Sequence, residues 1–440
     1  MFLCNFVAPN NLKTMKSTLI TALFLLSCLA CAMAQDFDTW FQDKTLRLDY
    51  SFSGDSRSQH ISLDEMKCSA GWYGRRVNLD SLLLRGDGQL CMTDSETGRV
   101  IYRHSFSTLF QEWQTTEEAT QVQKSFENVF LVPFPKRPAD ILVMLTDTHN
   151  KVQSELKHRV DPQDILIRPT FSCNDIEWEY LVKSGDSREK IDVAFVAEGY
   201  LGKQKKLFLR DCKACIGALK AHEPFKSMAD RFNFIAVMVP SQEQGVSIPH
   251  DNNWKQTPLS SSFDTFYSNR YLTTLRLKKL HDILSGVPYE HIIILAGTDN
   301  YGGGGIFNSY LMSAAHNSQN LPVVVHEFGH SFAGLADEYY YDDQYETNYP
   351  TDTEPWEPNI TTLVDFESKW ADMLGEDVQV PSIPSGENVF TELGVYEGGG
   401  YQSKGVYRPV QECRMKINLA PAFCPVCERA IRRMIDYQTK

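Results

Sequence analysis

His326, Glu327 and His330 form the pattern His-Glu-x-x-His, which supplies the residue types that a hydrolytic zinc site needs. Residues four apart on a helix are stacked neighbours, so both imidazoles would project from one face and could bind one metal ion. Glu327 would then lie beside the metal and point toward its water. The pattern therefore predicts a metal-dependent hydrolase. The alternative is an ordinary helix that carries two core histidines.

A catalytic zinc takes three protein ligands and keeps one position open. On a straight helix Asp337 would lie about 10 Å further along the axis, out of reach of the metal. Gly334 can adopt the left-handed conformation that ends a helix and bring Asp337 back, so Asp337 is the predicted third ligand. Glu338 is the close alternative, and the more distant Glu346 and Glu354 stay open. A solvated acidic loop is the alternative without a metal.

Glu327 is the predicted general base of this site. With its fourth position open, Zn2+ would lower the pKa of its bound water to about 7 and polarise the scissile carbonyl. Glu327 would take the water proton and pass it to the leaving amine. Met415, in the segment Cys413-Arg414-Met415, has the place of the methionine turn beneath the metal of metzincin-type peptidases. A plain core methionine is the alternative.

The segments around the motif alternate between strand and helix patterns. Three buried-strand patterns and two helical patterns follow one another, at residues 191–197, 203–220, 232–239, 273–284 and 291–296. This alternation predicts an α/β unit over residues 172–440.

Residues 35–158 carry short runs of alternating polar and apolar residues, separated by turn signals such as Gly86-Asp87-Gly88. The clearest runs lie at 46–52, 99–102 and 129–132. They predict an all-β, sandwich-like N-terminal domain without a cluster of catalytic residue types. Residues 159–171, which contain two prolines, are the predicted linker to the second domain.

The first residues have the pattern of a secretory signal peptide. A basic start at Met15 and a short apolar run precede the small-x-small site Ala32-Met33-Ala34, which predicts removal of residues 1–34 and export of the protein to the periplasm, cell surface or medium. Leu25-Leu26-Ser27-Cys28 resembles a lipoprotein cleavage site and leaves a lipid anchor as the alternative. No later segment is apolar for roughly 18 residues, so no transmembrane segment is expected.

The composition, 42% hydrophobic and 22% charged, is that of a globular protein, and the length favours two domains. The net charge of −13 argues against nucleic acid or an anionic membrane as partner, because both would repel the chain. We expect a protein or peptide substrate. The sequence assigns no oligomeric state.

Eight of the 11 cysteines follow the presequence, and an even number in an exported protein suggests disulfides. Cys68 with Cys91 is one possible pair. The Cys-x-x-Cys pairs at 212–215 and 424–427 could instead form a four-thiolate zinc site, although their separation is unusually long.

Most of residues 172–440 resembles one family, the IgA-peptidase-like zinc metallopeptidases, peptidase family sixty-four. The similar segments are 192–200, 241–245, 301–303, the highly specific run 326–339, 407–409, and the tail with Cys413-x-Met415 and Cys424-x-x-Cys427. The resemblance implies an α/β (α+β) metzincin-like zinc peptidase domain, preceded by the all-β sandwich-like domain, with endopeptidase activity on proteins. The immunoglobulin substrate belongs to few members and is not expected here.

The resemblance also implies roles outside the motif. By analogy with tyrosines near methionine turns, Tyr407 is predicted as a further catalytic residue that stabilises the oxyanion, with Arg408 as the alternative. The glycine-rich segment 301–306 is either a cleft rim that pairs with an extended substrate or a flexible turn. Archaeal-type metzincins complete a second, structural zinc with a Cys directly after the third ligand. That residue is Glu338 here, so we expect disulfides in the tail instead.

These observations predict an exported zinc-dependent endopeptidase. One alternative is a zinc-dependent amidase or deacylase that acts on cell-wall or small amide substrates with the same metal ligands. The other is a non-catalytic binding or adhesion protein, against which the intact Glu327 argues.

Overall fold

In the computed structural model of the protein, residues 36–170, 176–341 and 349–440 are described. The predicted signal peptide and its cleavage site lie outside these residues, as do Cys28, Cys173 and Glu346.

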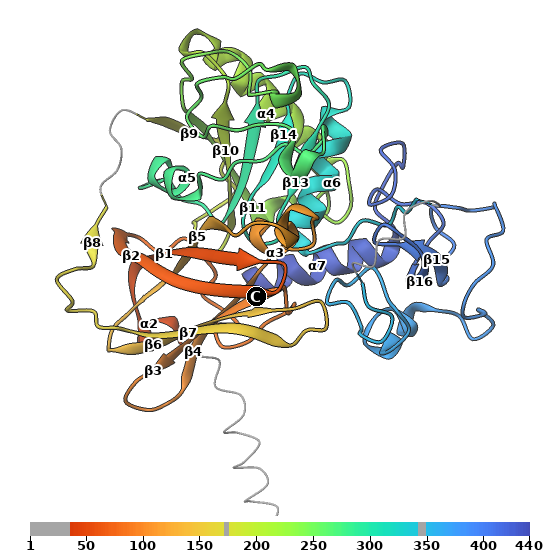
Figure 1. The fold of residues 1–440 in the computed structure, drawn as a ribbon, viewed down its shortest axis with the longest axis horizontal. Helices are drawn as coiled ribbons and strands as arrows, with labels where there is room; N and C mark the ends of the chain where they lie inside the picture. Colours follow the sequence, from red (N-terminus) through yellow and green to blue (C-terminus); the bar gives the residue numbers. More distant parts are fainter. Residues whose placement is uncertain (1–35, 171–175, 342–348) are drawn as a thin grey trace, which may run out of the picture.

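The N-terminal part consists of two four-stranded sheets, with strand orders β5-β1-β2-β8 and β4-β3-β6-β7 (Figure 1). Apart from β8, neighbouring strands are antiparallel. In β3 every second residue is buried, which is the alternation expected of a strand with one face on the core. The strands are β1 (Phe41–Asp55), β2 (Ser58–Ala70), β3 (Gly88–Asp94), β4 (Val100–Phe106), β5 (Lys124–Pro135), β6 (Ala139–Thr146), β7 (Val152–Val160) and β8 (Arg168–Pro169).

Two short helices accompany these sheets, α2 (Phe37–Trp40) and α3 (Leu109–Trp113). The side chain of Thr108 caps α3 by accepting a hydrogen bond from the backbone N–H of Gln111. Strand β8 comes from the segment predicted as a linker, and it pairs in parallel with Lys67 and Cys68 of β2. This segment therefore extends a sheet and is not a free tether.

The second part is built on a six-stranded sheet of order β13-β14-β12-β10-β11-β9. Four strands are parallel, and the edge strands β9 and β13 are antiparallel to their neighbours. Every residue of β10, β11 and β12 is buried, as expected for parallel strands covered on both faces. The strands are β9 (Glu177–Val182), β10 (Ile191–Glu198), β11 (Phe232–Met238), β12 (His291–Ala296), β13 (Gly303–Gly305) and β14 (Leu311–Ala314).

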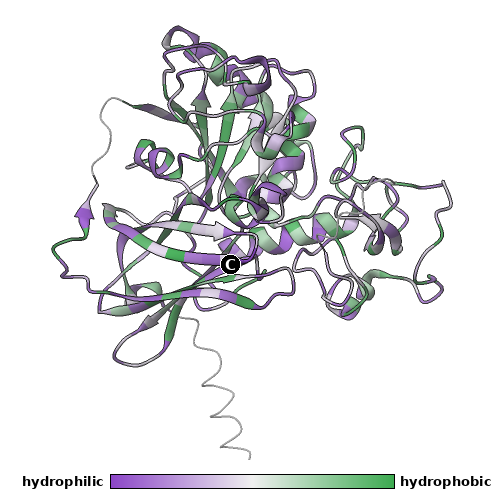
Figure 2. Ribbon diagram, in the orientation of Figure 1, coloured by the Kyte–Doolittle hydropathy of each residue, from purple (hydrophilic) through white to green (hydrophobic). Residues whose placement is uncertain are grey.

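Helices cover both faces of this sheet. Helices α4 (Lys205–Lys220), α6 (Asn320–Ala333) and α7 (Pro425–Thr439) pack against Val193 and Phe195 on one face, and Figure 2 shows the hydrophobic strands beneath them. Helix α5 (Leu277–Ile283) lies on the other face. It begins later than the pattern from 273 predicts, because the backbone N–H of Thr273 donates to Ser262 O at 3.2 Å in a bridge between two loops.

The remaining elements are short. Residues 349–424 contain a two-stranded sheet of β15 (Tyr396–Gly399) and β16 (Gln402–Arg408). Short 3-10 helices occur at η1 (Glu118–Thr120), η2 (Gly202–Gln204), η3 (Ala229–Arg231), η4 (Pro249–Asp251), η5 (Thr265–Tyr267), η6 (Phe366–Ser368) and η7 (Ala371–Met373). Within the described ranges, no helix has the length and apolar character needed to cross a membrane.

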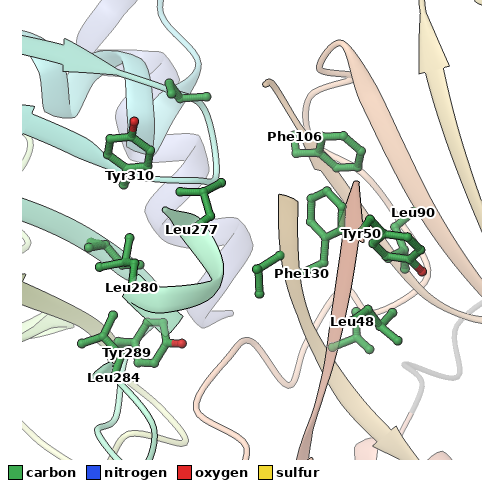
Figure 3. Close-up of a cluster of buried hydrophobic side chains, with 14 of the residues drawn as sticks. Leu48, Tyr50, Leu90, Phe106, Phe130, Leu277, Leu280, Leu284, Tyr289 and Tyr310 are labelled. Atoms are coloured by element: carbon green, nitrogen blue, oxygen red, sulfur yellow. The ribbon is translucent and has the colours of Figure 1, made fainter. Parts of the chain in front are cut away.

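The two parts of the chain share one hydrophobic core. Leu48 and Phe130 of the N-terminal strands belong to the same buried cluster as Leu277 and Leu280 of α5, and Figure 3 shows side chains of both groups, with Phe130 next to Phe106. Helix α7 adds a second connection, because the carbonyl of Tyr437 accepts a hydrogen bond from Asn78 Nδ2 at 2.8 Å. The N-terminal sheets therefore brace the face of the central sheet that carries α5.

Candidate functional site

The His-Glu-x-x-His pattern lies on helix α6, which begins at Asn320 with Pro322 in its first turn. The helix ends at Gly334, whose φ of 60° and ψ of 32° are the left-handed conformation that glycine adopts readily. The N–H of Gly334 donates to His330 O at 2.9 Å, and that of Leu335 donates to Gly329 O at 3.2 Å. The chain therefore turns back after α6, as its sequence predicts.

This turn brings Asp337 to the two histidines. The Nε2 atoms of His326 and His330 are 3.0 Å apart, and Asp337 Oδ1 lies 3.0 Å from the first and 3.2 Å from the second. The other carboxylates considered from the sequence lie elsewhere. Glu338 points into a separate cluster of cysteines, and Glu354 lies 3.7 Å from the ammonium group of Lys369.

Both imidazoles are held by backbone carbonyls on their far side. His326 Nδ1 donates to Arg414 O at 3.0 Å, and His330 Nδ1 donates to Leu335 O at 2.5 Å. A carbonyl can only accept, so each Nδ1 carries the hydrogen and each neutral ring turns the lone pair of Nε2 toward the other. This is how metal-binding histidines are usually oriented.

Three possible metal-ligand atoms thus meet at one point. Asp337 Oδ1 is buried and has no hydrogen-bond partner in the described part of the chain. Two nitrogen or oxygen ligands about 2.0 Å from a tetrahedral zinc lie about 3.3 Å apart, close to the three distances here. The site therefore fits a small divalent cation such as zinc.

Without a metal, the same arrangement holds a proton. Burial by itself lowers the pKa of His330, but the carboxylate of Asp337 outweighs it, and the pKa of His330 is raised to about 9. The site thus favours a positive charge at its centre, and a metal ion would displace the proton.

The site is partly accessible to solvent. The side chains of His326 and His330 are 13% and 14% exposed. Glu327 is half-buried, and a carboxylate oxygen lies within 4.8 Å of the histidine nitrogens, beside the centre. Burial raises the pKa of Glu327, although the neighbouring histidines oppose this. A carboxylate in this place can exchange a proton with water that reaches the partly accessible site.

Met415 and Tyr401 support the metal-binding residues from behind. Met415 is fully buried, and its sulfur lies so close to α6 that a Cβ atom on Gly329 would be 2.7 Å from it. The hydroxyl of Tyr401 donates a hydrogen bond to Asp337 Oδ2. Sequence reasoning missed Tyr401, because it lies 64 residues after Asp337 and follows no recognisable motif.

Tyr407 is not placed at this site, unlike Tyr401. It is half-buried on β16, its backbone pairs with Thr361, and the charges that act on its hydroxyl are those of Glu397 and Lys404. Among the described residues, none of its contacts reaches the histidines. Arg408 also lies elsewhere, since its guanidinium donates to backbone carbonyls of β15. The turn between β15 and β16 directs Tyr401 to Asp337, and Tyr407 lies further along the outgoing strand.

The glycine-rich segment forms the edge strand β13, which lies against Glu327. A Cβ atom on Gly305 would be 2.5 Å from Glu327 O and 3.1 Å from Oε2. Part of the outer edge of β13 is occupied, because Gly303 O accepts from Leu272 N at 3.3 Å. The segment is therefore a fixed wall beside the site and not a flexible turn.

The N-terminal part also reaches this region. Glu112, on α3, accepts a hydrogen bond from the hydroxyl of Tyr271 at 2.6 Å, and the charges of Asp337 and His330 act on its carboxylate. Tyr271 itself packs over Gly304 of β13. Glu112 and Tyr271 thus lie near the site, and neither stands out in the sequence.

The cysteines do not pair as suggested. Every described cysteine is a free thiol. Cys68 and Cys91 lie in different sheets. The pair at 212–215 is buried in α4, apart from Cys424 and Cys427, which instead meet Cys413 and Glu338.

Comparison with known protein families gives two matches. Residues 36–157 match the family model described as Peptidase M64 N-terminus, and residues 180–393 and 385–435 match the one described as IgA Peptidase M64. A search of the curated proteins finds no match.

Proposed function

This chain belongs to the IgA Peptidase M64 family, and is thus a peptidase; we propose that it is a zinc-dependent endopeptidase that cleaves peptide bonds in proteins. The observation that carries the proposal is the meeting of three possible metal-ligand atoms, from His326, His330 and Asp337, at separations of 3.0 to 3.2 Å. Three such atoms at these separations favour a positive charge between them.

His326, His330 and Asp337 would hold the zinc ion. Three protein ligands in a partly accessible site fit the pattern of a catalytic zinc, whereas structural zinc sites are closed by four protein ligands. When bound, the ion acidifies a coordinated water and polarises the scissile carbonyl.

Glu327 is the proposed general base. Its carboxylate lies beside the three ligands and would accept the proton of the attacking water, then deliver it to the leaving amine. The burial that raises its pKa helps both steps, because the group then gains and loses a proton more easily near neutral pH.

The surroundings of the site support a metzincin-like arrangement and a polypeptide substrate. The helix, the turn at Gly334, the returning Asp337 and the buried Met415 follow the order expected of metzincin-like peptidases. The wall formed by β13 would direct an extended segment past Glu327. Export, with or without a lipid anchor, stays a prediction of the sequence.

A comparison of residues 35–440 with the Glu327→Gln variant tests this proposal. We expect the unaltered protein to digest casein, to lose this activity with a chelator and to regain it with zinc. The variant should bind the same amount of zinc but cleave at least about 100-fold more slowly, which is the usual contribution of a general base. The exposed Glu376 provides a matched control, and Glu376→Gln should cleave normally.

Casein that stays intact while small amides are hydrolysed would favour the amidase alternative. Cleavage that resists the chelator, or a Glu327→Gln variant as fast as the unaltered protein, would reject the proposed mechanism.

A further inference from the structure

A second group of metal-binding side chains lies next to the site but faces away from it. Glu338 directly follows Asp337, and its carboxylate meets three cysteine sulfurs from the last 30 or so residues of the chain, with all four ligand atoms within 4.8 Å of one another. The four residues are at most 1% exposed. They are Glu338, Cys413, Cys424 and Cys427.

The distances within this group suit a tetrahedral metal site. Cys413 Sγ and Cys427 Sγ are 3.9 Å apart, and Cys427 Sγ lies 3.2 Å from Glu338 Oε1. Two sulfurs about 2.3 Å from a tetrahedral zinc lie about 3.8 Å apart, and a sulfur and an oxygen ligand about 3.5 Å apart. The group therefore has nearly the dimensions of a closed zinc site.

Disulfide formation does not explain this group. The separation of 3.9 Å is far longer than the roughly 2.05 Å of a disulfide bond. Three cysteines can form only one disulfide, which would leave a buried thiol beside a buried carboxylate.

The hydrogen bonds of the group are also incomplete. Asn359 Nδ2 donates to Glu338 Oε1 at 2.9 Å, but Oε2 is buried without any partner among the described residues. The positive charge of Arg408 acts on Glu338. The hydrogen bonds of the Arg408 guanidinium go instead to the backbone carbonyls of Glu397 and Gly398. A buried oxygen without a partner is costly, and a cation among the four side chains would supply one.

Backbone N–H groups already point at one of the sulfurs. Cys413 Sγ accepts from the N–H of Cys424 at 3.3 Å and from that of Met415 at 3.5 Å. Hydrogen bonds of this kind favour the thiolate, which is the form that binds a metal.

We propose that Glu338, Cys413, Cys424 and Cys427 bind a second zinc ion with a structural role. Thiolate sulfurs select zinc among the common divalent ions, and a carboxylate oxygen is an accepted fourth ligand. Four protein ligands in a fully buried place leave no position for water, so this ion does not act on substrate. Each thiol releases its proton when it binds the metal.

The position of this site explains what the ion would do. Glu338 belongs to the segment that returns from α6, Cys413 precedes Met415, and Cys424 and Cys427 begin α7. The N–H of Glu338 also donates to Met415 O at 2.8 Å. A metal ion here would tie these three segments together and fix Asp337 at the catalytic centre.

The metal content and the spectrum of the full mature chain test the proposal. Purified under reducing conditions, the protein should contain two zinc ions, as measured by plasma mass spectrometry. After replacement of zinc by cobalt, it should show the intense near-ultraviolet charge-transfer band of thiolate-bound cobalt, which a histidine and carboxylate site cannot give. One zinc ion per chain without this band would overturn the proposal, and so would a disulfide found by intact-mass analysis.

Variants separate the two sites. His326→Ala should lose one zinc ion and keep the thiolate band, whether or not the protein is a peptidase. Cys427→Ser should lose the other ion and the band, whereas Cys212→Ser, which removes a buried thiol outside the group, should keep both. An unchanged zinc content in Cys427→Ser would contradict the assignment.

Cys427→Ser could fail to fold, so Glu338→Cys provides a second test at the same site. This substitution supplies a fourth thiolate, so the zinc content should stay the same and the cobalt band should become stronger. A band of unchanged intensity in this variant would exclude Glu338 from the site.

Discussion

At the scale of single residues, the site depends on the hydrogen bonds made by the far side of each ligand. The carbonyls of Arg414 and Leu335 fix the two imidazoles with Nε2 turned inward. The hydroxyl of Tyr401 holds the outer oxygen of Asp337, so that the other oxygen faces the histidines. In the proposed zinc site, these partners would set the orientation of the three ligands.

Replacement of Tyr401 by Phe tests this support. The change removes the donor to Asp337 while keeping the ring, so Asp337 should be less well oriented. We expect zinc affinity or kcat/KM to fall about 10- to 100-fold, measured by competition with a chromogenic chelator and by peptide hydrolysis. Tyr437→Phe, which removes a hydroxyl bonded to Ser81 O far from the site, is the control and should change neither. Equal values for both variants would show that Tyr401 does not position Asp337.

Glu357 gives a prediction about the dependence of stability on pH. Its Oε1 accepts a hydrogen bond from the hydroxyl of Tyr349 at 2.8 Å, but its Oε2 is buried without a partner in the described residues. Burial, with a further contribution from the negative charge of Asp87, raises the pKa of Glu357 from 4.5 to about 7. The folded state therefore holds this proton more tightly than the unfolded state.

The stabilisation from this proton is fully present below pH 4.5 and is lost as the pH rises to 7. This shift in the pKa of Glu357 corresponds to about 3 kcal/mol of free energy of unfolding. Glu357→Gln, which stays neutral, should therefore unfold at about the same temperature as the unaltered protein at pH 4.5 and at a higher temperature at pH 8. Calorimetry across this range is the measurement, and a difference in Tm that does not vary with pH would exclude ionisation of Glu357.

At the scale of elements, the close contact between α6 and β13 sets the shape of the wall that β13 forms beside Glu327. Gly303 and Gly305 bring the strand within reach of Glu327, and a side chain at either position would meet that residue. Two glycines in an edge strand cost conformational entropy and are explained by this close approach.

Gly305→Ala should reduce activity without unfolding the protein. The new Cβ would lie 2.5 Å from Glu327 O, so strand and helix must move apart and carry Glu327 with them. A displacement of this kind can lower kcat/KM by about 100-fold. Gly217→Ala in α4 is the matched control, because a Cβ there meets nothing within 4 Å. The control should keep its activity and gain about 0.5–1 kcal/mol of stability, as alanine usually does in a helix. Full activity of Gly305→Ala would show that the close contact between β13 and Glu327 is not needed for catalysis.

At the scale of the whole molecule, we expect the N-terminal sheets and the central sheet to unfold as one unit. They share a hydrophobic core, and Arg47 of β1 joins them through a 2.7 Å ion pair with Asp282 of α5. Arg47 also pairs with the fully buried Asp49 at 2.6 Å. The N-terminal part thus packs directly on the peptidase part and places Glu112 within the electrostatic influence of Asp337 and His330.

Arg47→Met should lower the free energy of unfolding by about 3 kcal/mol, because it leaves Asp49 buried with Lys67 as its remaining ionic partner. Lys157→Met, which removes a cation that is 66% exposed from its pair with Asp140, should cost less than about 1 kcal/mol. Denaturant unfolding followed by tryptophan fluorescence and by loss of activity gives both values. The two signals should change in a single transition, and two separate transitions would contradict a shared core.

The sequence alone determined the centre of this site. His326, Glu327 and His330 lie on adjacent turns of one helix, and Gly334 provides the turn that made Asp337 the preferred third ligand, with Glu338 as the close alternative. The buried strands of the central sheet were also predictable, because short apolar runs rich in β-branched residues are typical of fully buried strands. The family match agrees with the resemblance seen in the sequence.

Only the tertiary structure decided which distant residues join this centre. It placed Tyr401 and not Tyr407 at Asp337, brought Glu112 from the N-terminal part, and gathered Glu338 with three cysteines that sequence reasoning assigned to disulfides. It also paired the predicted linker with β2. These contacts join segments tens to hundreds of residues apart, and they depend on how strands, turns and helices pack together. The periodicity of apolar residues along the sequence cannot predict that packing, because it indicates only which face of each element is buried.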